Sequence, residues 1–178
     1  MLAIVAILAT LSMPSLTSLI QSNAVSSNVN TFLADLRFAR SEAVRRGGAV
    51  LMCRSDAPEA ASPVCNTNSG PDGNGWVSGW IVFEDRDGSL TRNNGDQLLR
   101  IQGPITNLDS IVEINGASTT FQFTALGRMK SLTSATSVQF GSNFSMPNSR
   151  QRIVCVNLSG RARIAGDGTA SCTPGTDR

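Results

Sequence analysis

The chain of 178 residues contains no histidine and no tyrosine, and it has a single lysine, Lys130. Histidine is the most common general base in enzymes and the most common ligand of transition metals, so its absence argues against both kinds of site. A serine or cysteine nucleophile would need a lysine as its base, and Lys130 lies in a stretch with the composition of a polar turn. We therefore expect no catalytic residue, no metal site and no cofactor.

The four cysteines do not form a C-x-x-C motif, which excludes zinc-ribbon and thioredoxin-type sites. Three disulfide connectivities are formally possible. Local pairing, Cys53 with Cys65 and Cys155 with Cys172, is favoured because each bridge would close one loop rich in Pro, Gly, Ser and Asn. An even number of cysteines in such loops is typical of an oxidising compartment, so we expect the periplasm or the cell surface.

The chain also lacks an apolar run long enough to cross a membrane. Residues 1–13 are uncharged and mostly apolar, whereas a membrane-spanning helix needs about 20 residues. No basic segment precedes them, so the run does not have the form of a secretory signal. An interfacial helix is one explanation. Pro14 favours another, a sequence that begins inside a longer apolar segment, because such prolines are tolerated in membrane and bundled helices.

Residues 1–46 have the pattern of one long helix. Its first part, residues 1–20, is the apolar half, and residues 21–46 are amphipathic. A helix of this length would measure roughly 69 Å, so part of it must protrude from a domain of this size. The Gly47-Gly48 pair is typical of its end. Apolar residues recur at helical spacing along the second half, at Val25, Val29, Phe32, Leu33, Leu36 and Ala43.

The rest of the chain, residues 47–178, is expected to form one β-rich head. Short strands following a single helix predict an α+β fold with antiparallel sheets. An N-G turn follows the strand predicted at 111–115 and leads to the next strand at 119–125. The pattern predicts strands at 49–54, 76–85, 97–102, 111–115, 119–125, 136–142, 150–157 and 160–165.

The segment Asp85–Asp96 is rich in Asp, Asn and Gly, which invites a calcium-binding interpretation. A helix-loop-helix calcium site would need ligands at fixed offsets and a glutamate at the twelfth position, and the segment has neither. We expect a polar hairpin turn instead. The carboxylates of Glu84, Asp85 and Asp87 flank this turn, and we predict that they are solvated.

Charge is distributed unevenly along the chain. Residues 47–127 carry four basic and nine acidic side chains, whereas residues 128–178 carry seven basic and two acidic ones. Nearly all the cations are arginines, which suit bidentate contacts with phosphates or carboxylates. Two pairs, Arg150 with Arg152 and Arg161 with Arg163, are spaced so that each pair leaves one face of a strand.

If the two strands that carry these pairs meet through the turn at Ser159-Gly160, four arginines approach one surface. Such a cluster of like charges requires an anionic partner, and the phosphates of nucleic acid are the obvious candidate. The alternative is a solvated hairpin face that Asp167 or the acidic middle segment partly neutralises.

Three blocks of sequence resemble a known family: NTFLADLRFARSEAVRRGGAVLMCRS at 30–55, GWVSGWIVFEDRDGS at 75–89 and LLRIQGPI at 98–105. Together with the apolar helix containing Pro14, they resemble the FimT/FimU minor pilins of type IV pili and the related GspH pseudopilins of type II secretion. The family's methylated N-terminal aromatic residue and nearby glutamate would lie upstream of Met1, and we expect a truncation or late start.

The resemblance implies a type IV pilin-like fold, with the helix as membrane anchor before assembly and filament core afterwards. The helix packs under the sheet through Val29, Phe32, Leu33 and Leu36 and contacts other pilins through its apolar half. The protein would reside in the inner membrane with a periplasmic head, and then in the pilus at the cell surface.

The FimT branch of the family is further linked to binding DNA in natural transformation through a C-terminal G-R-x-R motif. Gly160-Arg161-Ala162-Arg163 matches this motif, which implies double-stranded DNA as a partner. Two alternatives stay open: a structural minor pilin at the pilus tip without DNA binding, and a type II secretion pseudopilin. Weaker phosphate contacts are expected from Arg150, Arg152, Arg128, Lys130 and Arg178.

Overall fold

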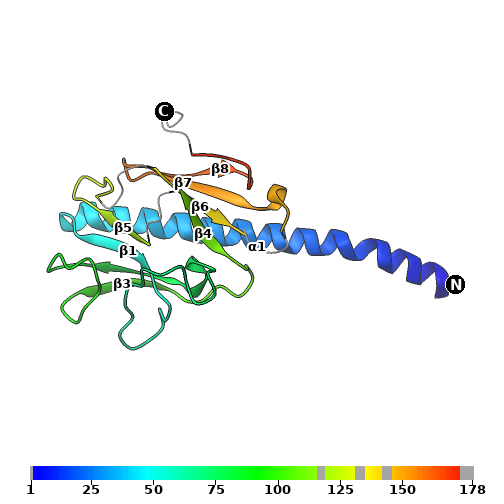
Figure 1. Cartoon of the computed structure of the whole chain (residues 1–178), viewed down its shortest axis with the longest axis horizontal. Coiled ribbons are helices and arrows are strands. Elements are labelled where there is room, and N and C mark those ends of the chain that lie inside the picture. Colours follow the sequence, from blue (N-terminus) through cyan, green and yellow to red (C-terminus); the bar gives the residue numbers. More distant parts are fainter. Residues whose placement is uncertain (1, 116–118, 131–134, 142–145, 173–178) are drawn as a thin grey trace.

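One long helix, α1 (Leu2–Arg46), forms the spine of the molecule, and Pro14 lies within it. The N-terminal part of α1 extends beyond the head, while the C-terminal part packs against the strands (Figure 1). No helix in the described part of the chain combines the length and the apolar character that crossing a bilayer requires. This computed structural model describes residues 2–115, 119–130, 135–141 and 146–172.

The head contains two antiparallel sheets of four strands, which agrees with the predicted α+β fold. The first sheet has the order β3-β2-β1-β5 and the second has the order β4-β6-β7-β8. In Figure 1, β7 and β8 lie on one side of α1 and β3 lies on the other. The strands are β1 (Val50–Arg54), β2 (Trp80–Glu84), β3 (Gln97–Gln102), β4 (Ile111–Asn115), β5 (Thr120–Phe123), β6 (Thr136–Phe140), β7 (Arg152–Val156) and β8 (Ala162–Gly166).

The strand predicted at 76–85 is wrong in its first part. Trp76–Ser78 form a turn of 3₁₀ helix, and β2 begins only at Trp80. Gly79 separates the two with a φ of 111°, and a β-carbon there would lie 2.4 Å from the Gln102 carbonyl oxygen. Only glycine fits this conformation and this close approach, so the extended backbone breaks at that residue.

The strands at 111–115 and 119–125 are not neighbours, although an N-G sequence connects them. β4 pairs with β6 in the second sheet, whereas β5 pairs with β1 in the first. The connection therefore crosses from one sheet to the other. The turn itself, at 116–118, lies outside the described residues.

The core joins both sheets to α1 through one aromatic side chain. The Phe32 ring lies 5.3 Å from the rings of both Trp76 and Trp80, measured between centroids, and 5.5 Å from the Phe140 ring. Trp80 belongs to the first sheet and Phe140 to the second, so Phe32 packs against both. The structure buries the whole predicted apolar stripe: Val25, Val29, Phe32, Leu33, Leu36 and Ala43.

Each sheet carries one disulfide on an inner strand. Cys53 of β1 is bonded to Cys65, and Cys155 of β7 is bonded to Cys172. This is the local pairing that the sequence favoured. The first bridge ties the long loop after β1 to the first sheet, and the second bridge ties the C-terminal segment to the second sheet.

Candidate nucleic-acid interface

The β7–β8 hairpin presents the Gly160–Arg163 motif at the end of the second sheet. The two strands pair as predicted, with Cys155 opposite Arg163 and Val156 opposite Ala162. Asn157 closes the turn, because its N–H donates to the Arg161 carbonyl at 3.0 Å and its side-chain oxygen accepts from the Arg161 N–H at 3.1 Å. Arg161 is exposed and Arg163 is half-buried.

The two motif arginines leave the hairpin on the face away from α1. Val154 and Val156 point into the core beside the helix, whereas Cys155 between them points outward to its disulfide partner. Arg163 lies directly opposite Cys155 and so shares its face. Arg161, two residues earlier on an extended backbone, projects to the same side.

Gly160 fixes the position of this turn. Its φ is +76°, and a β-carbon there would lie 2.0 Å from the Gly127 carbonyl oxygen. The Met129 N–H also donates to the Leu158 carbonyl at 3.1 Å. The turn therefore packs directly on the 127–130 segment, which brings Arg128 beside the motif.

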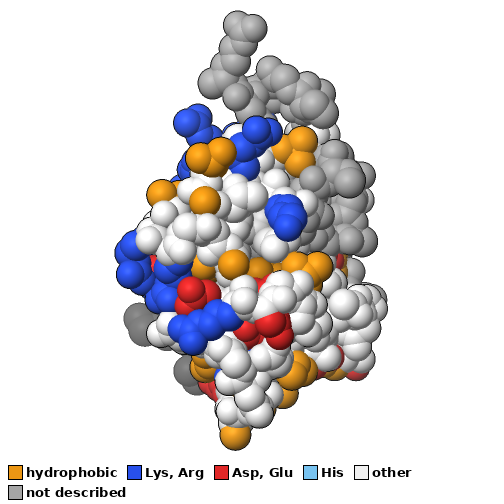
Figure 2. Space-filling model, turned by 90° about the vertical axis from the view of Figure 1, so that its left-hand side faces the viewer, with side chains coloured by type: hydrophobic (Ala, Val, Ile, Leu, Met, Phe, Trp, Pro, Cys, Tyr) orange, Lys and Arg blue, Asp and Glu red, His pale blue; other side chains and the backbone are white. Residues whose placement is uncertain are grey.

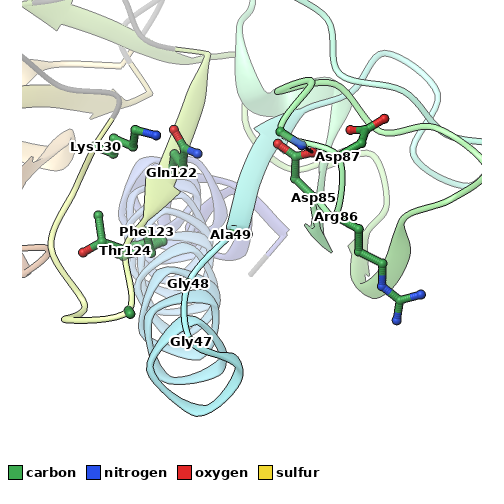
Figure 3. Close-up of a pocket in the computed structure, with 12 residues that line it drawn as sticks. Gly47, Gly48, Ala49, Asp85, Arg86, Asp87, Gln122, Phe123, Thr124 and Lys130 are labelled. Carbon is green, nitrogen blue, oxygen red and sulfur yellow. Dashed lines mark hydrogen bonds between the residues drawn. The ribbon is translucent and has the colours of Figure 1, made fainter.

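Arg128 and Lys130 are both exposed on this segment, with the buried Met129 between them. Lys130 borders a pocket of about 470 Å³ whose opposite side carries Asp85 and Asp87 (Figure 3). Lys130 therefore lies across this pocket from two carboxylates. Arg128 has no such neighbour among the residues that line its own hollow on the other side of the segment.

Arg150 and Arg152 do not join this surface, so the predicted gathering of four arginines is wrong. One guanidinium nitrogen of Arg150 donates to the side-chain oxygen of Gln21 on α1 at 2.7 Å. Arg152 starts β7, five residues before the turn, which corresponds to roughly 16 Å along the strand. Arg178 lies outside the described residues.

Asp167 faces Arg152, as the alternative interpretation anticipated. Hydrogen bonds from Thr169 chiefly hold the pKa of Asp167 below its ordinary value, and the charge of Arg152 contributes further. Arg152 is therefore partly neutralised by an acidic neighbour, which makes it a weaker candidate for a phosphate contact than Arg161.

One arginine of α1 that sequence reasoning left out, Arg40, contacts the 127–130 segment beside the motif, and Arg37 lies one helical turn before it. The Arg40 Nε donates to the Gly127 carbonyl at 2.9 Å, the same oxygen on which Gly160 packs. Arg37, one turn earlier, is exposed and lines a surface hollow of about 320 Å³ together with Arg40. The sequence could have indicated this, because residues spaced three apart lie on the same flank of a helix, here the flank next to the apolar stripe.

The cations at this end of the head differ in whether an acidic side chain lies beside them. Figure 2 looks at the end where α1 stops: some Lys and Arg side chains lie in the upper half, apart from the acidic side chains, and others lie beside the acidic side chains further down. Among the described residues, no carboxylate lies within 4.0 Å of Arg37, Arg40, Arg128 or Arg161. The ion pairs of the described residues involve other arginines.

The acidic loop between β2 and β3 is a turn held by its own carboxylates. Asp85 is buried, which contradicts the prediction that it is solvated, and its oxygens accept from the backbone N–H groups of Gly88, Ser89 and Leu90 at 2.9–3.1 Å. Asp96 accepts from the N–H groups of Arg86 and Asn93, both at 2.9 Å. Although Asp85, Asp87 and Asp96 converge within 4.8 Å, these oxygens already have donors, and the loop's own geometry accounts for the cluster.

Comparison with known proteins agrees with the fold. A family model described as "Type II transport protein GspH" matches residues 28–160. Two crystal structures of the type IV minor pilin FimU from Pseudomonas aeruginosa (strain PAO1) are similar in structure. The form in space group P21 is 16% identical with a TM-score of 0.59, covering 83% of this chain and 95% of that chain.

The form in space group P65 is also 16% identical, with a TM-score of 0.55, and covers 82% of this chain and 98% of that chain. No curated protein sequence matches the chain. At this level of identity the structural likeness establishes the fold alone. The family model, in contrast, matches most of the chain, and the protein therefore belongs to the GspH family.

Proposed function

We propose that this chain is a minor pilin of the type IV pilus that binds double-stranded DNA through Arg161 and Arg163, for uptake in natural transformation. The observation that carries the proposal is the position of the Gly160–Arg163 motif, on an exposed hairpin end with Arg128 beside it. Guanidinium groups here would contact phosphate oxygens, which position a duplex without reading its sequence. Binding should therefore depend little on sequence and weaken steeply with salt.

The long helix supports the pilin part of the proposal. Leu19 and Ile20 are 58% and 60% exposed on the part of α1 that leaves the head. Exposed apolar side chains of this kind need another apolar surface, such as the helices of other pilins or the inner membrane before assembly. The disulfide in each sheet suits a head that faces the periplasm and later the cell surface.

The test is DNA binding by the full-length chain in detergent, with both Arg161 and Arg163 replaced by alanine. The double variant should lose most of its affinity for a duplex in a gel-shift or anisotropy assay. Arg86→Ala is the matched control, because Arg86 is 57% exposed beside Glu84, in the loop that follows β2. Unchanged affinity in the double variant would refute the proposal.

The description of the matching family favours one rival, a pseudopilin of type II secretion that engages folded substrates. A structural minor pilin that contacts only other pilins is the other rival. A deletion strain separates the three functions. Loss of transformation supports DNA capture, loss of pili supports the structural role, and loss of secretion supports the pseudopilin.

A further inference from the structure

We infer that the nucleic-acid surface extends from the hairpin motif onto the helix, as an arginine track formed by Arg161, Arg128, Arg40 and Arg37. This inference rests on the proposed function and adds to it the half of the site that α1 supplies. The partner is the phosphate backbone of a duplex, and the track would contact it from three separate segments of the chain.

Gly127 is the point at which the three segments meet. Its carbonyl oxygen accepts the Arg40 Nε hydrogen at 2.9 Å, and the α-carbon of Gly160 packs against the same oxygen. A β-carbon on Gly127 would lie 2.8 Å from Arg40 Nε, so both glycines permit a contact that a side chain would block. The hairpin end, the 127–130 segment and the helix are therefore next to one another at Gly127, although Arg161 leaves the hairpin on the face away from α1.

The two flanks of α1 differ in whether their charged side chains have partners. Asp35, Glu42 and Arg46 lie on the flank toward the first sheet, where they form ion pairs or hydrogen bonds with strand residues or with each other. Arg37 and Arg40 lie on the opposite flank, where no described carboxylate is within 4.0 Å. Like charges held close together without acidic partners indicate a surface for an anion.

Aromatic side chains bear on which part of a nucleic acid the described surface contacts. Single-strand binders stack bases on aromatic side chains. Of the described aromatic side chains only Phe38 is not fully buried, and the Arg100 guanidinium covers its ring at 4.0 Å. The track thus offers charge without a stacking platform, which suits phosphates and disfavours single strands.

The experiment measures the affinity of full-length Arg37→Gln protein in detergent for a labelled duplex, over about 50–200 mM salt. Arg37 is exposed, so the variant should fold normally. Its affinity should fall by roughly fivefold to tenfold at low salt, and the slope of log affinity against log salt should decrease by about one. Arg86→Gln, which removes an exposed arginine of the loop between β2 and β3, should change neither quantity.

Gly160→Ala tests the packing at Gly127, because it displaces the hairpin end without removing charge. It should weaken binding, with a circular dichroism spectrum like that of the original chain. If the original chain binds no duplex, the proposed function itself fails. If loss of Arg161 and Arg163 abolishes binding while Arg37→Gln keeps full affinity and slope, the proposed function stands and the arginine track is wrong.

Discussion

Arginines in two regions of the molecule differ in whether a carboxylate lies beside them. Around the first sheet, cations are paired: Arg46 lies 2.7 Å from Glu84, and Arg100 lies 2.6 Å from the buried Asp35. Even the fully buried Arg54 pairs with Asp56. Near the place where the β7–β8 turn meets the 127–130 segment and α1, Arg37, Arg40, Arg128 and Arg161 have no described carboxylate within 4.0 Å. Arginine count alone would not distinguish the two sides, since the difference lies in what each cation faces.

The paired arginines are expected to contribute to stability, and the unpaired arginines to binding. Charges that are paired and partly buried hold the first sheet to α1, and removing one partner leaves the other without its ion pair. Charges that are exposed and unpaired contribute little to folding, so they are available to a ligand. Substitutions on the first-sheet side should therefore change stability, and substitutions on the second-sheet side should change affinity.

Phe32→Ala removes the contact that both sheets share and should have the largest effect. The ring is fully buried against Trp76, Trp80 and Phe140, so its loss should cost about 3–5 kcal/mol of unfolding free energy. Urea unfolding followed by tryptophan fluorescence would measure this. Separate transitions for the two sheets would show that they fold independently and would contradict a single core.

Replacing Cys155 and Cys172 with serine should destabilise the second sheet while leaving the arginine track in place. A loop of 17 residues would be released, which corresponds to roughly 3 kcal/mol in the chain-entropy estimate. The contact between Gly160 and Gly127 does not depend on this bridge. Thermal unfolding and duplex affinity should therefore change independently, and a parallel loss of both at low temperature would contradict the separation.

Asp35→Asn should weaken the attachment of the first sheet to α1. Its carboxylate accepts from Trp80 Nε1 at 2.8 Å and from an Arg100 guanidinium nitrogen at 2.6 Å. The amide could keep the first hydrogen bond but not the ion pair, so we expect a loss of about 1–2 kcal/mol in urea unfolding. Arg37→Gln, two residues further on the opposite flank, is the control. An equal loss in both variants would refute the distinction between the flanks.

Glu42→Gln should have the smallest effect, and it should depend on pH. Hydrogen bonds from Arg45 and then Arg46 lower the pKa of Glu42 from 4.5 to about 2. Because the folded pKa lies below the unfolded one, the stabilisation is present above about pH 4.5 and disappears as pH falls toward 2. The variant should melt about 1–3 °C lower than the original chain at pH 7 and equally at pH 2. A difference that persists at pH 2 would exclude this ion pair as the cause.

The sequence predicted features that depend on local pattern. The helix, its buried stripe and most strands follow from hydrophobic spacing, and the segment 97–102 was predicted with the bounds that β3 has. The 3₁₀ turn at Trp76 was missed because alternation there resembles a strand, and only the close approach of Gly79 to Gln102 breaks it. The pairing partners of β4 and β5 were missed because an N-G turn does not reveal a change of sheet.

In the candidate site, too, the sequence predicted local patterns but not contacts between distant residues. The i, i+2 spacing of Arg161 and Arg163 is local and could be read directly, as could the hairpin that carries them. Arg150 and Arg152 have the same spacing, but Arg150 contacts Gln21, far away in the sequence, and Arg152 donates to the carbonyls of Ser149 and Gln151. Arg40 contacts the site through Gly127, 87 residues later in the chain.

The contact between Arg40 and Gly127 also affects how the molecule would bear a mechanical load. A DNA molecule held only by the β7–β8 hairpin would pull on an edge strand, whose hydrogen bonds can break one after another. A DNA molecule held at Arg37 and Arg40 would pull on α1 itself. That force would act along the buried stripe from Val25 to Ala43, where every packed side chain resists sliding at once. The helix would then transmit tension from the bound polymer without passing it through the sheets.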